Sequence, residues 1–380
     1  MSLNNFSYSH TIGIASFLGR GFMNPVDVRL DSDGLVYVLS RSNAGNQDVR
    51  VSVQTQDSEF LHEFGRWGTD PGQTTQPSAM AIDSEDRIYV TDEFMHNVTV
   101  FDREGQFIDR WGESGTENGQ FNRPSGISID SEGNLHIVDH LNTRIQILGP
   151  DGSFISSFGT FGSEPGQLNF PWGIAIDKDD SIWIADWRND RVQKFSRDGD
   201  FINSIGSSGK KDGQFNRPSG VHVTSDGSIF VADWRNDRVQ KLTPTGEPLM
   251  QIGSSGDGEG ELNRPAGVDV DQHGDIYVAD RGNNRVMLFN REGRYVERFF
   301  GDATVSKSGL KYLLENSLPL RLRDMAILEE QKRFMAPASV RVIDDRMYVA
   351  DYSYNRIQIY RKEAYPLTAD QILPLSLIHI

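Results

Sequence analysis

The chain has 380 residues, including 37 glycines, 15 prolines and no cysteine, and its formal net charge is -16. The absence of cysteine excludes disulfides, zinc–thiolate sites and a cysteine nucleophile, and the acidic charge argues against a polyanionic partner such as nucleic acid. Abundant glycine and proline without a low-complexity tract favour short strands joined by tight turns. No signal-like N-terminus or membrane-length apolar run is present. We therefore expect a soluble protein with no membrane association, and the cytoplasm is the favoured compartment.

A proline-led unit recurs along the chain. Each unit contains four short apolar runs, such as PSGISID, NLHIVD, RIQIL and FISSFG in the third unit. Four strands per unit predict one blade of a β-propeller. Asp and Gly in the DSEGN and TSDGS segments predict tight hairpins between the first two strands. The units begin at Pro25, Pro77, Pro124, Pro171, Pro218, Pro265 and Pro337, and the five central prolines are spaced 47 residues apart.

These units resemble the NHL repeat family. The family pattern of Pro-x-Gly, an apolar-Ala-Asp strand and Asn-x-Arg-Val-Gln is present as PSGVHV, IFVAD and NDRVQK in the fifth unit. The resemblance covers roughly residues 10–361 and implies an all-β fold, a single propeller of four-stranded blades. Seven units and seven fourth strands predict seven blades. Six blades, the common number in NHL propellers, stay the alternative.

The two ends of the propeller domain, residues 1–364, are expected to complete one blade. The seventh unit has three strands (PASVRVI, RMYVAD and RIQIY), and the N-terminal IGIASFLG is predicted to supply the fourth. Such closure hides edge strands. Residues 302–335 predict two short helices broken near Pro319, which either form a functional lid or only cover apolar surface. In the tail, residues 365–380, the last six (LSLIHI) match a translated sequencing-library transposon end and are expected to be foreign.

Charge pairs recur at a single spacing in five units. An Asp ends the second strand, and an Arg follows it five residues later at the start of the third strand. A pair that recurs at identical spacing is typical of a structural role, in which Arg bridges the carboxylate and backbone carbonyls. The pairs are Asp139 with Arg144, Asp186 with Arg191, Asp233 with Arg238, Asp280 with Arg285 and Asp351 with Arg356.

Other positions differ between the units, and these are the candidates for function. Arginine and aromatic residues lie in the loops after the second strands and in the loops that enter new blades, and family topology places both sets of loops on one face. Such residues are frequent in binding hot spots, so we predict a ligand or partner surface. The alternative is that they only stack between neighbouring blades. The residues are Trp187, Arg188, Trp234, Arg235, Arg281, Tyr352, Arg217 and Arg264.

The first strand of each unit, which is expected to be innermost, also differs between units. The difference is at the residue between its two apolar positions. Blades two to four have small residues there, whereas four contiguous blades have ionisable ones: His222, Asp269, Arg341 and Arg29. These four are the candidate catalytic residues, because they can orient an anionic or carbonyl ligand while a histidine exchanges protons near neutral pH. The alternative is a buried salt-bridge network that holds blades together.

These patterns favour a binding or scaffold propeller over an enzyme. We expect a monomer that recognises a protein or a small polar ligand through the Trp/Arg loop face. The alternative is a lyase or hydrolase at the channel mouth, and whether the protein is an enzyme stays open. RNA binding, known for tripartite-motif NHL proteins, is disfavoured by the charge. No cofactor is expected, although calcium or zinc is not excluded: the histidines are scattered, unlike those of amidating lyases with this fold.

Overall fold

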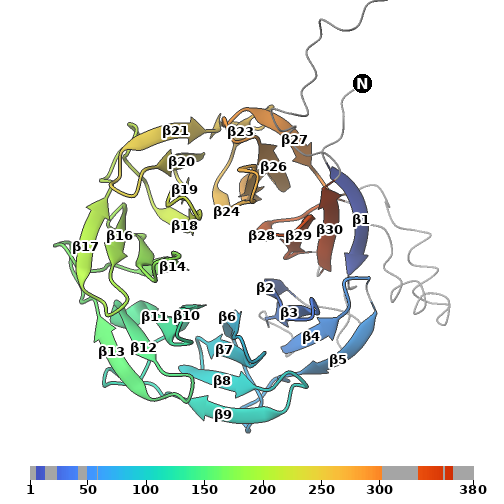
Figure 1. Ribbon diagram of the computed structural model, residues 1–380, viewed down its shortest axis with the longest axis vertical. Helices are drawn as coiled ribbons and strands as arrows, with labels where there is room; N and C mark the ends of the chain where they lie inside the picture. The colour runs from blue at the N-terminus through green and yellow to red at the C-terminus, as the bar shows by residue number, and fades with distance from the viewer. Residues whose placement is uncertain are drawn as a thin grey trace, which may run out of the picture.

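A computed structural model of the chain describes residues 6–12, 24–41, 49–57, 59–301, 333–353 and 356–362. In this part, seven four-stranded antiparallel sheets form a ring around a central opening (Figure 1). The chain is therefore an all-β propeller, with the first strand of each unit innermost. The seven-bladed prediction is confirmed, and the alternative of six is wrong. The predicted helices and the C-terminal tail lie outside the described residues.

The first three blades contain β2 to β13. Blade one consists of β2 (Pro25–Leu30), β3 (Val36–Ser40), β4 (Arg50–Gln54) and β5 (Phe60–Phe64). Blade two consists of β6 (Pro77–Ile82), β7 (Ile88–Asp92), β8 (Asn97–Phe101) and β9 (Phe107–Trp111). Blade three consists of β10 (Pro124–Ile129), β11 (Leu135–Asp139), the 3₁₀ turn η1 (His140–Asn142), β12 (Arg144–Leu148) and β13 (Phe154–Phe158).

The next three blades contain β14 to β27. Blade four consists of β14 (Pro171–Ile176), β15 (Ile182–Asp186), β16 (Arg191–Phe195) and β17 (Phe201–Ile205). Blade five consists of β18 (Pro218–Val223), β19 (Ile229–Asp233), β20 (Arg238–Leu242) and β21 (Pro248–Ile252). The short parallel pair β22 (Ser254–Ser255) and β23 (Glu261–Leu262) leads to blade six: β24 (Pro265–Val270), β25 (Ile276–Asp280), the 3₁₀ turn η2 (Arg281–Asn283), β26 (Arg285–Phe289) and β27 (Tyr295–Phe299).

Blade seven is closed by the two ends of the propeller. It consists of β28 (Pro337–Ile343), β29 (Arg346–Asp351), β30 (Arg356–Lys362) and the N-terminal β1 (Phe6–Ile12), which pairs antiparallel with β30. The closure is as predicted, but the strand is FSYSHTI and not IGIASFLG. The reason lies in β30, which has seven residues where the third strands of other blades have five, so that its partner pairs as far as Phe6. Of the segment IGIASFLG, only Ile12 lies among the described residues.

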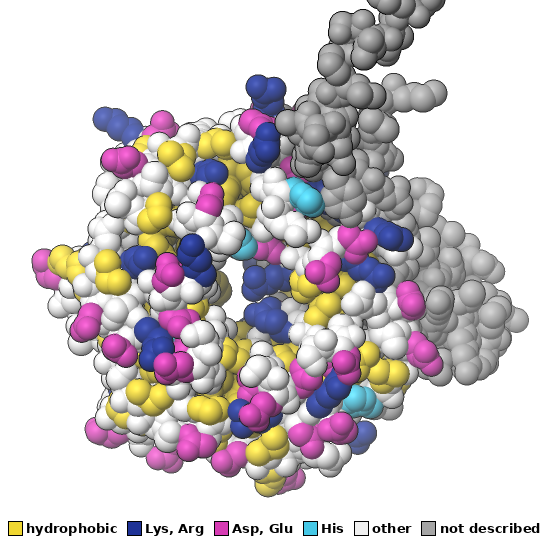
Figure 2. Space-filling view, in the orientation of Figure 1, with side chains coloured by type: hydrophobic (Ala, Val, Ile, Leu, Met, Phe, Trp, Pro, Cys, Tyr) yellow, Lys and Arg dark blue, Asp and Glu magenta, His cyan; other side chains and the backbone are white. Residues whose placement is uncertain are grey.

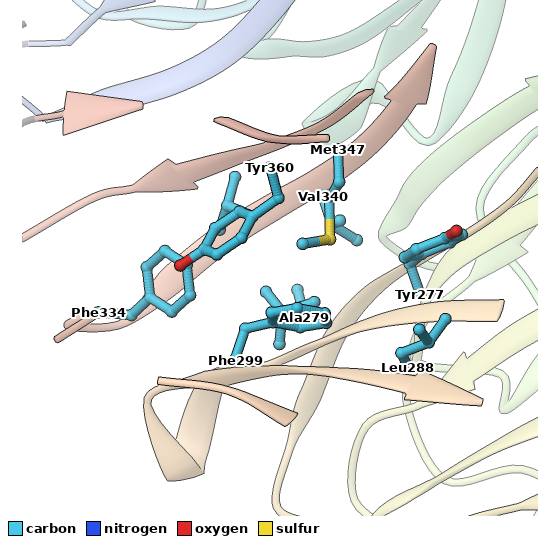
Figure 3. Close-up of a cluster of buried hydrophobic side chains, with 10 residues drawn as sticks. Tyr277, Ala279, Leu288, Phe299, Phe334, Val340, Met347 and Tyr360 are labelled. Atoms are coloured by element: carbon cyan, nitrogen blue, oxygen red, sulfur yellow. The ribbon is translucent and has the colours of Figure 1, made fainter. Parts of the chain in front are cut away.

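The hydrophobic core lies between blades, as layers of side chains from neighbouring sheets. Figure 3 shows one such layer, in which Tyr277 and Leu288 of blade six and Met347 and Tyr360 of blade seven are grouped together. All four side chains are at most 1% exposed. Because each blade buries its apolar faces only against its neighbours, closing the ring completes the core.

The five predicted Asp–Arg pairs are all formed, with Nε to Oδ2 distances of 2.7–2.9 Å. In blade four, Asp186 accepts the backbone N–H of Asn169 at 2.7 Å, the side-chain amide of Asn189 at 2.8 Å and Nε of Arg191 at 2.9 Å. Burial raises the pKa of Asp186, against the effect of these donors. The Nη atoms of Arg191 donate to three carbonyl oxygens of the connection entering the blade, those of Ser163, Glu164 and Gln167. The pair therefore joins two successive loops.

Blades one and two each lack one member of the pair, and a residue of the fourth strand replaces it. In blade one, where Ser40 stands in place of Asp, Arg50 pairs with Glu63 of β5 at 3.1 Å. In blade two, where Asn97 stands in place of Arg, Arg110 of β9 supplies the guanidinium group. It donates to three carbonyl oxygens of the entering connection, those of Thr69, Asp70 and Gln73. Glu63 and Arg110 occupy the same position of their strands, so this position compensates for either loss.

Candidate ligand-binding site

Strand pairing brings two sets of loop residues to one end of the propeller. In each blade the proline that begins the first strand pairs with the last residue of the second strand, as Pro171 does with Asp186. The residues next to this proline and those that follow the second strand therefore lie together. We call this end of the propeller the mouth.

The mouth contains a cavity of about 450 Å³, which is within the range of small-molecule pockets. Residues from blades one, four, five, six and seven line it. One side is aromatic and belongs to blades four and five, whereas the other carries arginine and tyrosine. The lining residues are Val26, Arg41, Trp172, Trp187, Ser219, Trp234, Ala266, Arg281, Ala338 and Tyr352.

Three tryptophans form the aromatic wall of the cavity. Trp172 is 54% exposed, and its ring centroid lies 6.4 Å from that of Trp187 with an angle of 36° between the rings. Trp187 and Trp234 are partly exposed and occupy equivalent positions in neighbouring blades. No indole N–H of these three residues has a hydrogen-bond partner within the described part of the chain. A ligand in the cavity therefore meets both aromatic faces and free donors.

The predicted arginines of the loops stack on these aromatic rings. Arg217 lies over Trp187 at 4.3 Å and Arg264 over Trp234 at 5.4 Å, in both cases from the following blade. Arg188 and Arg235 lie 3.8 and 5.9 Å from the rings of Phe170 and Trp234, respectively. The stacking between blades that we considered as an alternative is thus present. This stacking does not fill the cavity, because Trp187 and Trp234 still line it.

The opposite wall has one free cation. Arg41 donates to Gln76 Oε1 at 3.1 Å and is ion-paired with Glu93. Arg281, in contrast, is exposed at the start of η2, and its guanidinium group makes no hydrogen bond or ion pair with any residue that the structure describes. Tyr352 also lines the wall and is partly exposed. The cavity therefore combines indoles, a phenol and an unpaired guanidinium group.

Two of the four predicted catalytic residues are in contact. Nδ1 of His222 lies 2.8 Å from Oδ1 of Asp269, and the backbone N–H of Val342 donates to Oδ2 at 2.7 Å. Burial favours the neutral form of Asp269, but the hydrogen bond from His222, the charge of Arg341 and the Val342 N–H outweigh it and lower its pKa. This contact links blades five, six and seven.

The other two predicted catalytic residues lie on neighbouring blades seven and one. Arg29 pairs with Asp27 and donates to the carbonyl of Val28 at 2.9 Å. Burial lowers the pKa of Arg29, and the charge of Arg341 lowers it further, against the attraction of Asp27. Arg341 itself makes no hydrogen bond or ion pair in the described part of the chain. Figure 2 shows basic, acidic and histidine side chains gathered on one margin of the central opening.

The two groups of predicted site residues are at different depths of the propeller. The charged residues lie four positions beyond the proline of the innermost strand, for example His222 beyond Pro218, which corresponds to about 13 Å along a strand. The structure thus separates the channel group (His222, Asp269, Arg341, Arg29 and Asp27) from the mouth cavity. A single site composed of all predicted residues does not form.

Three residues of these sites were missed in the sequence. Trp172 follows the proline of blade four, where the other six blades have Val, Ser or Ala, and this difference was a usable signal. Arg41 occupies the same position as Trp187, but the longer first-blade loop concealed the equivalence. Asp27 stands where four other blades have glycine, and only the pairing of β2 shows that it reaches Arg29.

Within the described residues, no group of three or more His, Asp or Glu side chains is placed to hold a metal ion. Among the same residues, no helix has the length and the apolar character that crossing a bilayer requires.

Sequence comparison identifies the repeats. The NHL repeat family matches residues 168–195, 215–242 and 262–287. A second family, described as a 6-bladed beta-propeller, matches residues 74–158. No curated protein matches the chain by sequence. The matches lie in blades two to six, which are also the blades with the most regular pattern.

Similar solved structures are themselves propellers at low identity. A catalytically inactive histidine-to-alanine variant of virginiamycin B lyase from Staphylococcus aureus, with quinupristin, is 14% identical with a TM-score of 0.67, covering 94% of this chain and 99% of the lyase. A streptogramin B lyase is 14% identical with a TM-score of 0.66, covering 96% and 100%. Hydrazine synthase from Kuenenia stuttgartiensis is 15% identical with a TM-score of 0.62, covering 91% and 98%. These likenesses show the fold alone. The repeat matches, together with the four-stranded blades, show that the chain belongs to the NHL-repeat β-propellers.

Proposed function

We propose that this protein is a ligand-binding propeller that takes a small polar ligand in the mouth cavity. The observation that carries the proposal is the combination, around about 450 Å³, of three tryptophans with free indole N–H groups and the unpaired Arg281. Pockets of this size with few polar groups are typical of small-molecule sites. A protein partner, the other ligand class considered, requires a broader contact surface than this cavity offers.

The test is a thermal-shift screen of small polar compounds against the full chain. A ligand that binds only the native state raises the melting temperature by mass action. We expect hits whose shift is lost in Trp234→Ala, which removes part of the aromatic wall. Trp67→Ala is the matched control, because Trp67 is 44% exposed and does not line the cavity. A screen without hits, or hits that are insensitive to Trp234→Ala, would reject the proposal.

A propeller enzyme of the lyase or hydrolase type is the second candidate. The observation that favours it is the orientation of His222, whose Nδ1 is held by Asp269 while Nε2 has no partner in the described part of the chain. A histidine held in this way by a carboxylate can take or donate a proton through its other nitrogen. Arg341, the nearby unpaired cation, is suited to orienting an anionic or carbonyl group of a substrate.

This candidate is tested with a panel of ester and lactone compounds that includes quinupristin, analysed by liquid chromatography. The enzyme hypothesis predicts turnover that is lost in His222→Ala and strongly reduced in Asp269→Asn. Trp234→Ala should retain the activity, because the channel group and the cavity are separate. Turnover that survives in His222→Ala would exclude the channel group as the catalytic site.

A further inference from the structure

Free arginines are concentrated at the mouth, in a chain whose net charge is -16. Within the described residues, six arginines of blades three to six share two properties. They lie in the loops of the mouth, and their guanidinium groups make no ion pair or hydrogen bond to protein. They are Arg123, Arg188, Arg217, Arg235, Arg264 and Arg281. Only Arg281 of the six lines the cavity, but unpaired cations on one face generate a local positive potential that attracts anions.

Aromatic stacking holds several of these guanidinium groups in place. Arg217 and Arg264 lie over the rings of Trp187 and Trp234, with Cζ at 4.3 and 5.4 Å from the ring centroids. A guanidinium group that lies over a ring and makes no hydrogen bond to protein keeps its N–H groups available to a carboxylate or phosphate. Because its position is already restricted, less conformational entropy is lost when an anion binds.

Two acidic residues beside these arginines bind the backbone. Asp190 accepts the backbone N–H of Arg217 at 2.7 Å, and Asp237 accepts that of Arg264 at 2.8 Å. Asp237 also accepts the hydroxyl of Ser255 at 2.7 Å. These carboxylates therefore fix the loops and leave the two guanidinium groups without an ion pair.

A neighbouring histidine responds to the same positive charge. His140 lies against Trp172, with ring centroids 5.4 Å apart. Burial lowers the pKa of His140, and the charges of Arg123 and Arg188 lower it further, although a hydrogen bond to a backbone carbonyl and the charge of Glu93 act in the opposite direction. The basic character thus extends to the aromatic wall.

We infer that the ligand of the mouth cavity is an aromatic anion, with a flat ring against Trp172, Trp187 and Trp234 and a carboxylate or phosphate group bound by Arg281, the unpaired arginine that lines the cavity. This inference rests on the proposed function and specifies its ligand class. The tryptophan faces suit a planar ring, and the planar guanidinium groups suit both kinds of anion.

Isothermal titration calorimetry on the full chain tests this with matched pairs of probes. Indole-3-acetate is compared with indole-3-acetamide, and adenosine 5′-monophosphate with adenosine. We expect each anion to bind at least about tenfold more tightly than its neutral counterpart. Arg281→Ala should weaken binding of the preferred anion by about tenfold or more, the size expected for a lost charge-assisted hydrogen bond. The preference between the two anions distinguishes a carboxylate ligand from a phosphate ligand.

Arg291→Ala is the control, because it removes the same charge from an exposed arginine that pairs only with neighbouring Glu292. It should leave both affinities unchanged. Equal affinity for anion and neutral counterpart, or full affinity of Arg281→Ala, would overturn the inference. If neither anion binds while the screen yields neutral ligands, the inference fails and the proposed function stands. A screen without any hit would remove both.

Discussion

Arg191 and Arg188 are three residues apart in one loop of blade four, yet they belong to different parts of the molecule. Arg191 is buried and donates to Asp186 and to three backbone carbonyls. Arg188 is exposed, and its guanidinium group lies over the ring of Phe170 without a hydrogen bond or ion pair in the described part of the chain. Arginine recurs at the first position in six blades, whereas at the second it is found in two. Repetition therefore marks residues that hold the propeller together, and variation marks residues that are free to bind.

The scaffold and the mouth also differ where a blade departs from the repeat pattern. Where Asp or Arg is missing in blades one and two, Glu63 or Arg110 replaces its function from the fourth strand. At the mouth, Trp172 stands where the other six blades have Val, Ser or Ala, and it lines the cavity. Such a difference is expected when scaffold residues must suit the fold of every blade and mouth residues must suit one specific surface.

The largest expected effect is the loss of a buried carboxylate from the scaffold. Asp280 is fully buried and pairs with Arg285, which is 1% exposed. We expect Asp280→Ala to lower the free energy of unfolding by about 3–5 kcal/mol, because it leaves a buried, uncompensated charge. The change is measured by urea unfolding followed by circular dichroism.

The adjacent Arg281→Ala is the matched comparison. Because Arg281 is exposed and unpaired in the described part of the chain, its removal should change the free energy of unfolding by no more than about 0.5 kcal/mol. Equal destabilisation by the two substitutions would break the distinction between scaffold and mouth.

An intermediate effect is expected from exchanging the compensating residues. Glu63→Ala leaves Arg50, which is 3% exposed, without its carboxylate, and we expect a loss of about 2–3 kcal/mol. Adding Ser40→Asp, which restores the pair of the other blades, should recover about 1–2 kcal/mol of that loss. The double-mutant cycle is measured by urea unfolding. If Ser40→Asp gives no recovery, the fourth strand does not substitute for the second.

Most of the fold could be predicted from the sequence, because periodic positions report periodic structure. The prolines and the Asp–Arg pairs determined the blades, their number and the scaffold contacts. The closing strand was misplaced because both IGIASFLG and FSYSHTI have apolar residues suited to a strand. The pairing of Phe6–Ile12 with β30 decides between them.

The site could be predicted only in part. Trp187, Trp234 and Arg281 could be singled out because they break the repeat, and all three line the mouth cavity. Their role in binding stays a prediction. The channel group and the mouth cavity lie at different depths along the innermost strands. Alignment of the repeats shows this depth only when the pairing of the strands is also known. Arg41 is paired because it contacts Glu93 of the next blade. This contact joins two different loops, and no local sequence pattern predicts it.

A smaller effect is expected from removing a stacked arginine of the mouth. Arg217→Ala eliminates the contact with Trp187, and such contacts contribute about 0.5–1 kcal/mol at exposed sites. We expect a decrease in melting temperature that is small compared with that of Asp280→Ala. Arg217→Lys, which retains the charge but not the planar stacking, should recover only part of it. A decrease as large as that of Asp280→Ala would place Arg217 in the scaffold.

The smallest expected effect concerns the pH dependence of the channel group. The pKa of Asp269 is lowered in the folded state, where His222 and the Val342 N–H overcome the effect of burial. Its contribution to stability is therefore present above the ordinary carboxyl pKa, near 4, and is lost as the pH falls through the lower folded-state value. The stability difference between wild type and Asp269→Asn should accordingly narrow between pH 6 and pH 3, as measured by urea unfolding. Asp200→Asn, at an exposed position, is the control. A difference that stays constant would mean that Asp269 acts in the channel through packing rather than through its charge.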